Sequence, residues 1–223
     1  MAADEVLLES AAAGVASLRF YTWTEATVSL GYFQPAAAVA GDGRLASLPL
    51  IRRPTGGETL VHDHELTYAL ALPAGRPWQD GPWMPRMHRS IAAALAGLGI
   101  ASQLAAEEAA SATPLCFLHP TPGDLLVAGA KVAGSAQRKR KGALLQHGAV
   151  LLARSPHTPS LPGIRELAGV DLDPVVLRAM IEQRFRDETG WDITASDWSA
   201  AEQRRIEDLC ETKYAQAWWN RKR

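Results

Sequence analysis

The sequence is poor in cysteine, in net charge and in long apolar runs. Its 223 residues include two cysteines, which are too few for a disulfide framework and typical of a reducing compartment. The formal net charge of -1 argues against strong nonspecific attraction to nucleic acid. No apolar run reaches the roughly 18 residues of a membrane helix. The first ten residues, MAADEVLLES, are acidic where a signal peptide is basic. We therefore expect a cytoplasmic protein with no membrane and no nucleic-acid partner.

The pattern of residues along the chain predicts an α+β fold. The chain is long enough for one large domain or two small ones, and 47% of it is hydrophobic, which suffices for a core. Segments rich in aromatic and β-branched residues predict strands, and they come before a helical C-terminal part. We expect strands in SLRFYTW, TVSLGYF, LPLIRRP, ETLVHDHELTYALALP and GALLQHGAVLLA, a hairpin turning at Ala128-Gly129, a loop over 73–83, and helices over 2–14, 87–100, 173–190 and 199–219.

Polar chemistry is concentrated in the segment RRPTGGETLVHDHE, residues 52–65. Two adjacent arginines can hold a phosphate or a carboxylate. Adjacent glycines let backbone N–H groups approach a ligand closely. Gly-Gly after Pro-Thr is also an ordinary turn, so the local pattern leaves a ligand loop and a plain hairpin both open.

A second candidate is the strand expected around Lys131. Strict alternation would place Lys131, Ala133, Ser135 and Gln137 on one face, with small residues between them. That face could line a pocket, or it could be the solvated face of an edge strand. His147 lies between two apolar runs, where a lone histidine is more often a satisfied core group than a catalyst.

The two cysteines have different contexts. Cys116 lies in the proline-rich stretch TPLCFLHPTPGDLL, which makes plain core packing a poor explanation for it. Cys210 follows Leu209 in an expected helix, and we interpret it as a packing residue. A nucleophilic thiol reacts as its thiolate, which a nearby cation favours. Lys131 is the candidate cation.

Several separated motifs in this order resemble one protein superfamily. RRPTGG, HDHELTY, GAKVAGSAQ and LQHG, together with ADEVLL, RFYTW, SLGYFQ, ETKY and WNRKR, are similar to the lipoate ligase, octanoyltransferase and biotin ligase superfamily. The similarity is greatest to the bacterial octanoyltransferases that load octanoyl groups onto the glycine-cleavage H protein. It runs nearly end to end and implies one catalytic domain over 1–223, with a mixed or antiparallel sheet and flanking helices.

The resemblance also implies a set of site residues. In the superfamily the arginine–glycine loop folds over the acyl group and the lysine strand forms the other wall. In the octanoyltransferase branch, a cysteine before the lysine hairpin accepts the acyl group, and the lysine favours its thiolate. Cys116 and Lys131 then fall on the catalytic positions. The implied substrate-binding residues are Arg53, Gly56, Gly57, His62, Ser135, Gln137 and His147.

Some features depart from the superfamily patterns. Glu58 replaces the third glycine of the ligase branch, and neither the ligases' accessory C-terminal domain nor the Arg-Gly-rich signature of biotin ligases is present. All three differences favour a transferase. The family also begins with a strand before the first helix, whereas this chain begins inside that helix. Two explanations stay open: a strand of the sheet is missing, or the assigned start is late.

The implied reaction is a two-step transfer without metal or cofactor. Octanoyl-acyl carrier protein would acylate Cys116, and a lysine of the glycine-cleavage H protein or another lipoyl domain would take the acyl group. The motifs name no base for that lysine. Two alternatives stay open: an ATP-dependent lipoate ligase, and a non-catalytic acyl-binding module. The run RKRK at 138–141 is either a solvated loop or a docking surface for acidic carrier proteins.

Overall fold

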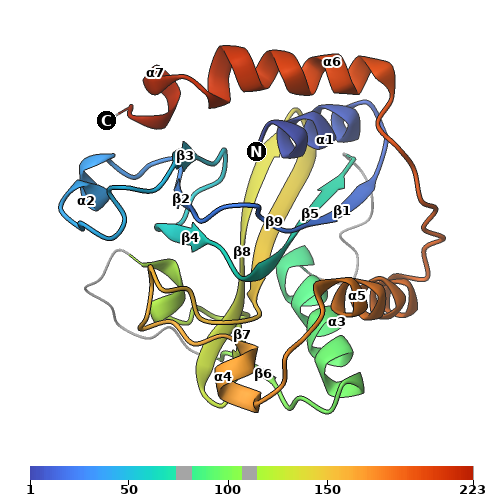
Figure 1. Ribbon diagram of the computed structural model, residues 1–223. Helices are drawn as coiled ribbons and strands as arrows, with labels where there is room; N and C mark the ends of the chain where they lie inside the picture. Colours follow the sequence, from blue (N-terminus) through green and yellow to red (C-terminus); the bar gives the residue numbers. More distant parts are fainter. Residues whose placement is uncertain (74–81, 107–114, 223) are drawn as a thin grey trace.

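The computed structural model describes residues 1–73, 82–106 and 115–222. A six-stranded antiparallel sheet lies at the centre of the fold (Figure 1). Its strand order is β1-β5-β9-β8-β7-β6. The two long strands β8 and β9 form its middle and pair from Ala133–Val150 to Arg140–Ala143. The strands are β1 (Ser17–Tyr21), β5 (Glu65–Leu72), β6 (Gln103–Leu104), β7 (Leu125–Val127), β8 (Ala130–Arg140) and β9 (Ala143–Leu151).

A smaller sheet of order β3-β2-β4 lies beside the first one. It contains β2 (Thr27–Leu30), β3 (Leu50–Arg52) and β4 (Leu60–His62). β2 pairs with β3 in parallel and with β4 in antiparallel orientation. Only Asp63 and His64 separate β4 from β5, so the two sheets are joined directly at this point. Residues 53–59, called here the arginine–glycine loop, connect β3 to β4.

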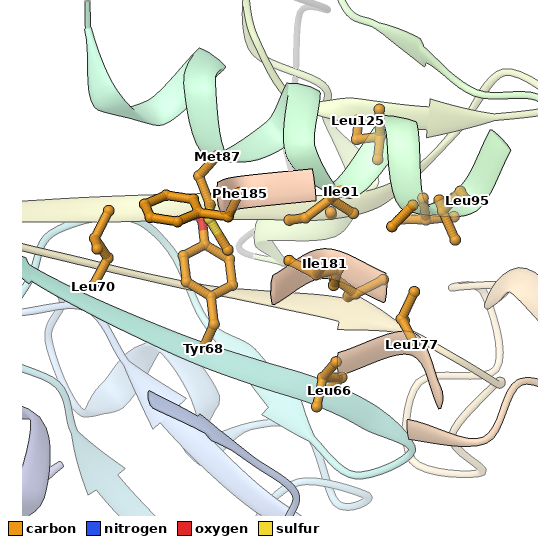
Figure 2. Packing of buried hydrophobic residues seen from close by; sticks show 14 of the residues in the cluster. Leu66, Tyr68, Leu70, Met87, Ile91, Leu95, Leu125, Leu177, Ile181 and Phe185 are labelled. Carbon is orange, nitrogen blue, oxygen red and sulfur yellow. The ribbon is translucent and has the colours of Figure 1, made fainter. Parts of the chain in front are cut away.

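Helices cover both faces of the large sheet (Figure 1). α1 (Ala2–Ala12) packs on β5 and β9, and α6 (Ala200–Leu209) packs on α1. On the other face, α3 (Trp83–Gly97) and α5 (Pro174–Thr189) lie against each other and contact β8 and β5. Figure 2 shows the main core at that interface, where Tyr68 of β5 approaches Met87 of α3 and Phe185 of α5. The remaining helices are α2 (Ala37–Ala40), α4 (Ile164–Ala168) and α7 (Ala217–Asn220).

Local signals explain where the long C-terminal helices begin and end. The Asp173 carboxylate accepts a hydrogen bond from the Val175 N–H at the start of α5, and Gly190 ends that helix with φ 65°. Ser199 and Glu202 form a capping box at the start of α6. These caps fix both ends of α5 and the start of α6.

Most expected elements are confirmed, but one helix begins earlier than expected and another is interrupted. The helix expected over 87–100 begins at Trp83, and the loop expected over 73–83 lies largely outside the described residues. The helix expected over 199–219 is interrupted by a π-helical turn, Cys210–Tyr214, before α7. This interruption lets Tyr214 and Trp219 pack together under α1. Among the described residues, no helix is long and apolar enough to cross a membrane.

Candidate active site

A largely apolar cavity lies between the arginine–glycine loop and the middle strands of the large sheet. Small residues of β8 and β9 leave space on one wall, and the turn that carries Cys116 forms another. The lining residues are Met1, Tyr21, Arg53, Gly57, Leu60, His62, Thr67, Cys116, Phe117, Gly134, Ser135, Ala136, His147, Gly148 and Ala149.

The arginine–glycine loop wraps around the buried side chain of Arg53. Its guanidinium donates to the carbonyl oxygens of Ser29, Gly56 and Glu58 at 2.5–3.1 Å. Gly57 has φ +88°, a left-handed conformation that favours glycine, and an added Cβ there would lie 2.9 Å from Arg53 Nη2. Burial lowers the pKa of Arg53 to about 10, so the side chain is still a cation at neutral pH. No carboxylate pairs with it among the described residues.

Arg52 takes no part in the cavity, although the sequence offered both arginines as ligand-binding groups. Its guanidinium donates to backbone carbonyls of the chain's C-terminal end, including those of Trp219, Asn220 and Lys222. It also donates to the carbonyls of Gly31 and Gln34. Arg52 therefore ties α7 to the small sheet, and Arg53 alone of the two reaches the cavity.

Cys116 begins a short 3₁₀ turn, Cys116–Leu118. The backbone N–H of Cys116 donates to the Thr59 carbonyl of the arginine–glycine loop at 2.9 Å. Lys131 Nζ lies 3.9 Å from Cys116 Sγ and 3.1 Å from the Cys116 carbonyl oxygen. The same ammonium forms a buried ion pair with Asp124 at 2.7 Å. The structure thus brings the two predicted catalytic residues together, and Asp124 holds the lysine in place.

A β-bulge directs Lys131 toward Cys116, and the face predicted from strict alternation is wrong for this reason. Leu126 pairs with Lys131 and Leu125 pairs with Ala133, so Val132 is the extra residue. Val132 and Ala133 both join the core under α3. Lys131 instead lies beside Gly134, where an added Cβ would be 2.6 Å from Lys131 Cε. β8 is also an inner strand, which rules out the edge-strand alternative.

Ser135 and Gln137 take part in a polar network with residues of β5, β9 and α3. The Ser135 hydroxyl contacts His88 Nε2 at 2.5 Å and the Tyr68 hydroxyl at short range. Gln137 donates to Gln146, which in turn donates to Tyr68. Ser135 still lines the cavity, but its hydroxyl is engaged on the α3 side. Gln137 and Gly56 are not among the described lining residues.

His62 lies deep in the cavity wall and is paired with a carboxylate. Its Nδ1 is 2.7 Å from Glu65 Oε1, and its ring stacks on Trp23 with centroids 4.1 Å apart. Thr67 Oγ1 also donates to Glu65 Oε1, at 2.5 Å. The other ring nitrogen, Nε2, is buried without a hydrogen-bond partner among the described residues.

His147 belongs to a second histidine–carboxylate pair on the same cavity. Its Nδ1 is 3.3 Å from Asp4 Oδ2, and its Nε2 is 2.6 Å from Thr55 Oγ1. Burial lowers the pKa of His147, and Asp4 offsets part of that shift. Burial alone would raise the pKa of Asp4, but the N-terminal ammonium, His147 and Arg19 bring it well below its ordinary value. His147 is therefore the satisfied buried group that its sequence context predicts, and it also borders the cavity.

Two other expectations are resolved outside the cavity. Cys210 is exposed while Leu209 is buried, so the interpretation of Cys210 as a packing residue is wrong. Cys210 ends α6 in ordinary helical conformation, about 100° around the helix axis from Leu209, and at that position it faces solvent. In the RKRK run, Arg138 donates to the Pro54 carbonyl at 2.7 Å and Arg140 pairs with Glu5 at 3.1 Å. Arg138 and Arg140 are therefore bound to the protein itself.

Sequence reasoning missed three carboxylates of the site. Asp124 stands just before β7, and the hairpin predicted at Ala128-Gly129 would have placed it near Lys131. Glu65 follows His62 by three residues in HDHE, which was a readable signal. Asp4 lies 143 residues from His147, and no local pattern could have joined them.

The arrangement suits chemistry at a thiol near a buried acyl chain. A cysteine sulfur lies beside an ammonium, an uncompensated guanidinium borders the same cavity, and the space behind them is apolar. Cations of this kind favour a thiolate and stabilise negative charge that develops on a carbonyl oxygen. No cluster of metal-ligating side chains occurs in the described part of the chain.

The fold is that of lipoate protein ligases. A bipartite lipoate protein ligase from Thermoplasma acidophilum has a TM-score of 0.75 at 21% identity, over 99% of this chain and 89% of that one. A lipoate-protein ligase A with bound ATP gives 0.78 at 23% identity, over 99% and 92%. At this identity the likeness concerns the fold alone, and it confirms the expected α+β architecture with flanking helices.

The chain belongs to the lipoyl protein ligase A/B catalytic domain family, whose model matches residues 1–158. Octanoyltransferase LipM of Brevibacillus brevis is 33% identical over 264 residues, covering 100% of this chain and 94% of the relative. Octanoyltransferase LipM of Bacillus subtilis is 32% identical over 265 residues, covering 100% and 93%. The resemblance drawn from the separated motifs is therefore confirmed.

Proposed function

We propose that this protein transfers an octanoyl group from octanoyl-acyl carrier protein to a lysine of a lipoyl-accepting protein, through a thioester on Cys116. The observation that carries the proposal is the buried Lys131 ammonium 3.9 Å from Cys116 Sγ, at the edge of an apolar cavity. Its octanoyltransferase relatives support the acyl group and the reaction class. The activity belongs to lipoate biosynthesis.

In the first step, the Cys116 thiolate attacks the carbonyl carbon of the donor thioester. A new C–S bond forms to Cys116, and the carrier's thiolate leaves with the electron pair of the old bond and takes up a proton. Lys131 stabilises the attacking thiolate, and Arg53 supplies a second positive charge on the cavity wall. The octanoyl tail lies in the apolar cavity, where burial stabilises binding by about 0.8 kcal/mol per CH₂.

In the second step, the acceptor lysine attacks the Cys116 thioester and forms an amide. The glycine-cleavage H protein is the proposed acceptor, and other lipoyl domains are its alternatives. Thioester exchange needs no external energy source because both thioesters have similar reactivity, and amide formation from a thioester is downhill. The transferase therefore works without ATP, which a ligase would need to activate a free acid.

The two free cysteines provide a matched pair of variants. Purified protein is incubated with octanoyl-acyl carrier protein and its intact mass is measured. We expect an octanoyl adduct on the wild type and on Cys210→Ala, and none on Cys116→Ala, because Cys210 is exposed and lies outside the cavity. A normal adduct on Cys116→Ala would overturn the covalent mechanism.

A second pair of reactions separates the transferase from the ligase. One tube holds octanoyl-acyl carrier protein, acceptor H protein and apyrase, and the other holds free octanoate, ATP, magnesium and the same acceptor. We expect octanoylation of the acceptor in the first tube, lost in Cys116→Ala. Modification in the second tube alone would assign a ligase, and modification in neither would favour a passive acyl-binding protein.

A further inference from the structure

The acceptor lysine must lose a proton before it can attack, and one cavity-lining side chain has an open basic nitrogen. An ordinary lysine has a pKa of about 10.4, so at neutral pH nearly all of its amine is protonated. His62 lines the cavity together with Cys116, and 3% of its surface is exposed. Its Nε2 is buried without a partner among the described residues. A buried polar atom left unpaired costs about 1–3 kcal/mol, which calls for an explanation.

The neighbours of His62 determine which nitrogen carries the proton. Glu65 Oε1 accepts from Thr67 Oγ1, so this oxygen is an acceptor and not a donor. Thr67 Oγ1 in turn accepts from Trp23 Nε1 at 2.9 Å. Nδ1–H of His62 therefore donates to Glu65 at 2.7 Å, and in this tautomer the lone pair is on Nε2. The Trp23 stack fixes the plane of the ring.

The other basic side chains around the site are unsuited to take a proton. The Lys131 ammonium is paired with Asp124, and Arg53 is a guanidinium without a free lone pair at neutral pH. Both ring nitrogens of His147 are engaged, by Asp4 and Thr55. Both ring nitrogens of His88 are engaged by Gly123 and Ser135, on the α3 side of the sheet.

We propose that His62 is the base that deprotonates the acceptor lysine in the second step, and that Glu65 positions its ring and stabilises its charged form; the inference rests on the proposed transferase function. The lysine ammonium gives one proton to Nε2. The freed lone pair forms the C–N bond at the thioester carbon, and the C–S bond breaks with its electrons going to Cys116. A second proton passes from nitrogen to that sulfur. The imidazolium later releases its proton to water.

The test uses two nucleophiles that differ in their need for a base. Octanoyl-enzyme is prepared with octanoyl-acyl carrier protein, and its decay is followed by mass with unmodified H protein or with hydroxylamine. Hydroxylamine is already neutral at neutral pH and needs no deprotonation. We expect that His62→Gln still forms the acyl-enzyme, and that the ratio of its transfer rate to H protein over its cleavage rate by hydroxylamine falls about 100-fold below the wild-type ratio.

Two further variants sharpen the assignment. Glu65→Gln keeps the shape but removes the charge beside His62, so we expect a smaller fall in the same ratio. His64→Gln is the matched control, because the His64 side chain is 56% exposed and its Nδ1 lies 3.7 Å from Asp63 Oδ1. It should leave both rates unchanged.

The outcomes distinguish this inference from the function on which it rests. If His62→Gln transfers to H protein at the wild-type rate, or slows both nucleophiles equally, His62 is not the base. If the wild-type protein never forms an acyl-enzyme, the proposed transferase fails and the inference fails with it. A selective loss with H protein, absent in His64→Gln, supports the assignment.

Discussion

Two histidine–carboxylate pairs border the same cavity, and they differ in what the second ring nitrogen does. In the His62–Glu65 pair, Nε2 is open. In the His147–Asp4 pair, Nε2 is occupied by the Thr55 hydroxyl. We call them the open pair and the closed pair. An imidazole whose two nitrogens are both engaged has no lone pair for a substrate, so only the open pair is available for proton transfer.

The sequence separations of the two pairs point to the same division of roles. The open pair is local, with its members three positions apart at the junction of β4 and β5. The closed pair joins residues 143 positions apart and connects α1, β9 and the arginine–glycine loop. Asp4 also accepts from Arg19 and Tyr21 of β1. The closed pair is thus a structural junction, whereas the open pair supports a reactive nitrogen.

The largest expected effect comes from removing the charge at that junction. Asp4 is fully buried, and its carboxylate serves Arg19, Tyr21 and His147. Asp4→Asn should lower the free energy of unfolding by about 3–5 kcal/mol, because Arg19, Tyr21 and His147 all lose a charged hydrogen-bond acceptor and such bonds contribute about 1.5–3 kcal/mol each. Urea denaturation measures the loss. Glu65→Gln should cost less, since Glu65 serves only His62 and Thr67 among the described residues and one of its oxygens is already unpartnered.

Activity gives the complementary half of the same comparison. Octanoyl-enzyme of Asp4→Asn, assayed well below its melting temperature, should keep the wild-type ratio of transfer rates to H protein and hydroxylamine. If Asp4→Asn instead kept full stability and lost transfer to H protein selectively, the roles of the two pairs would have to be exchanged.

Local patterns in the sequence predicted the parts of the site that depend on neighbouring residues. The hairpin turn at Ala128-Gly129 is confirmed, and both residues have positive φ, which glycine favours at such a turn. The arginine–glycine loop and the Cys116 stretch were also recognisable as candidate site segments from their clustered arginine, glycine and proline residues, although the local pattern of the loop left an ordinary turn open. The structure brings Cys116 and Lys131 within contact distance.

The features that sequence could not predict depend on register or on distant contacts. One extra residue in β8, Val132, reverses the face of Lys131 relative to Ser135, and alternation alone gives the opposite answer. Cys210 is exposed although its neighbour Leu209 is buried, because adjacent helical positions point about 100° apart and the tertiary fold decides which of them meets the core. The closed pair needs the tertiary fold to bring α1 onto β9. Each error therefore arises where a single-residue shift or a long-range contact decides.

The closed pair should also make stability depend on pH. Burial lowers the pKa of His147 and of His88 below the ordinary value of 6.5. As pH falls below 6.5, the unfolded chain takes up these protons while the folded chain stays neutral, so stability present above 6.5 is lost toward acid. Each histidine contributes about 1.4 kcal/mol per pH unit until its folded pKa is reached. The lowered pKa of Asp4 acts only below 3.8.

Urea unfolding between pH 7.5 and pH 5 isolates this histidine effect. In the wild type the free energy of unfolding should decrease as the pH is lowered. This decrease per pH unit should be smaller in His147→Gln, which has one fewer buried neutral imidazole. Identical slopes would mean that His147 takes up its proton equally in both states, and the closed pair would then be an ordinary ion pair.

The smallest expected effect comes from removing the partner that closes the pair. Thr55→Val keeps the shape of the side chain but leaves His147 Nε2 without its hydroxyl donor. We expect a loss of about 1–2 kcal/mol in the free energy of unfolding, the cost of one buried unpaired group. Thr55→Ser, which keeps the hydroxyl, should lose less. Because His147 serves structure and His62 serves proton transfer, neither variant should change the ratio of transfer rates to H protein and hydroxylamine. A selective loss of transfer to H protein in Thr55→Val alone would show that the Thr55–His147 bond belongs to the proton path, and the division between the two pairs would fail.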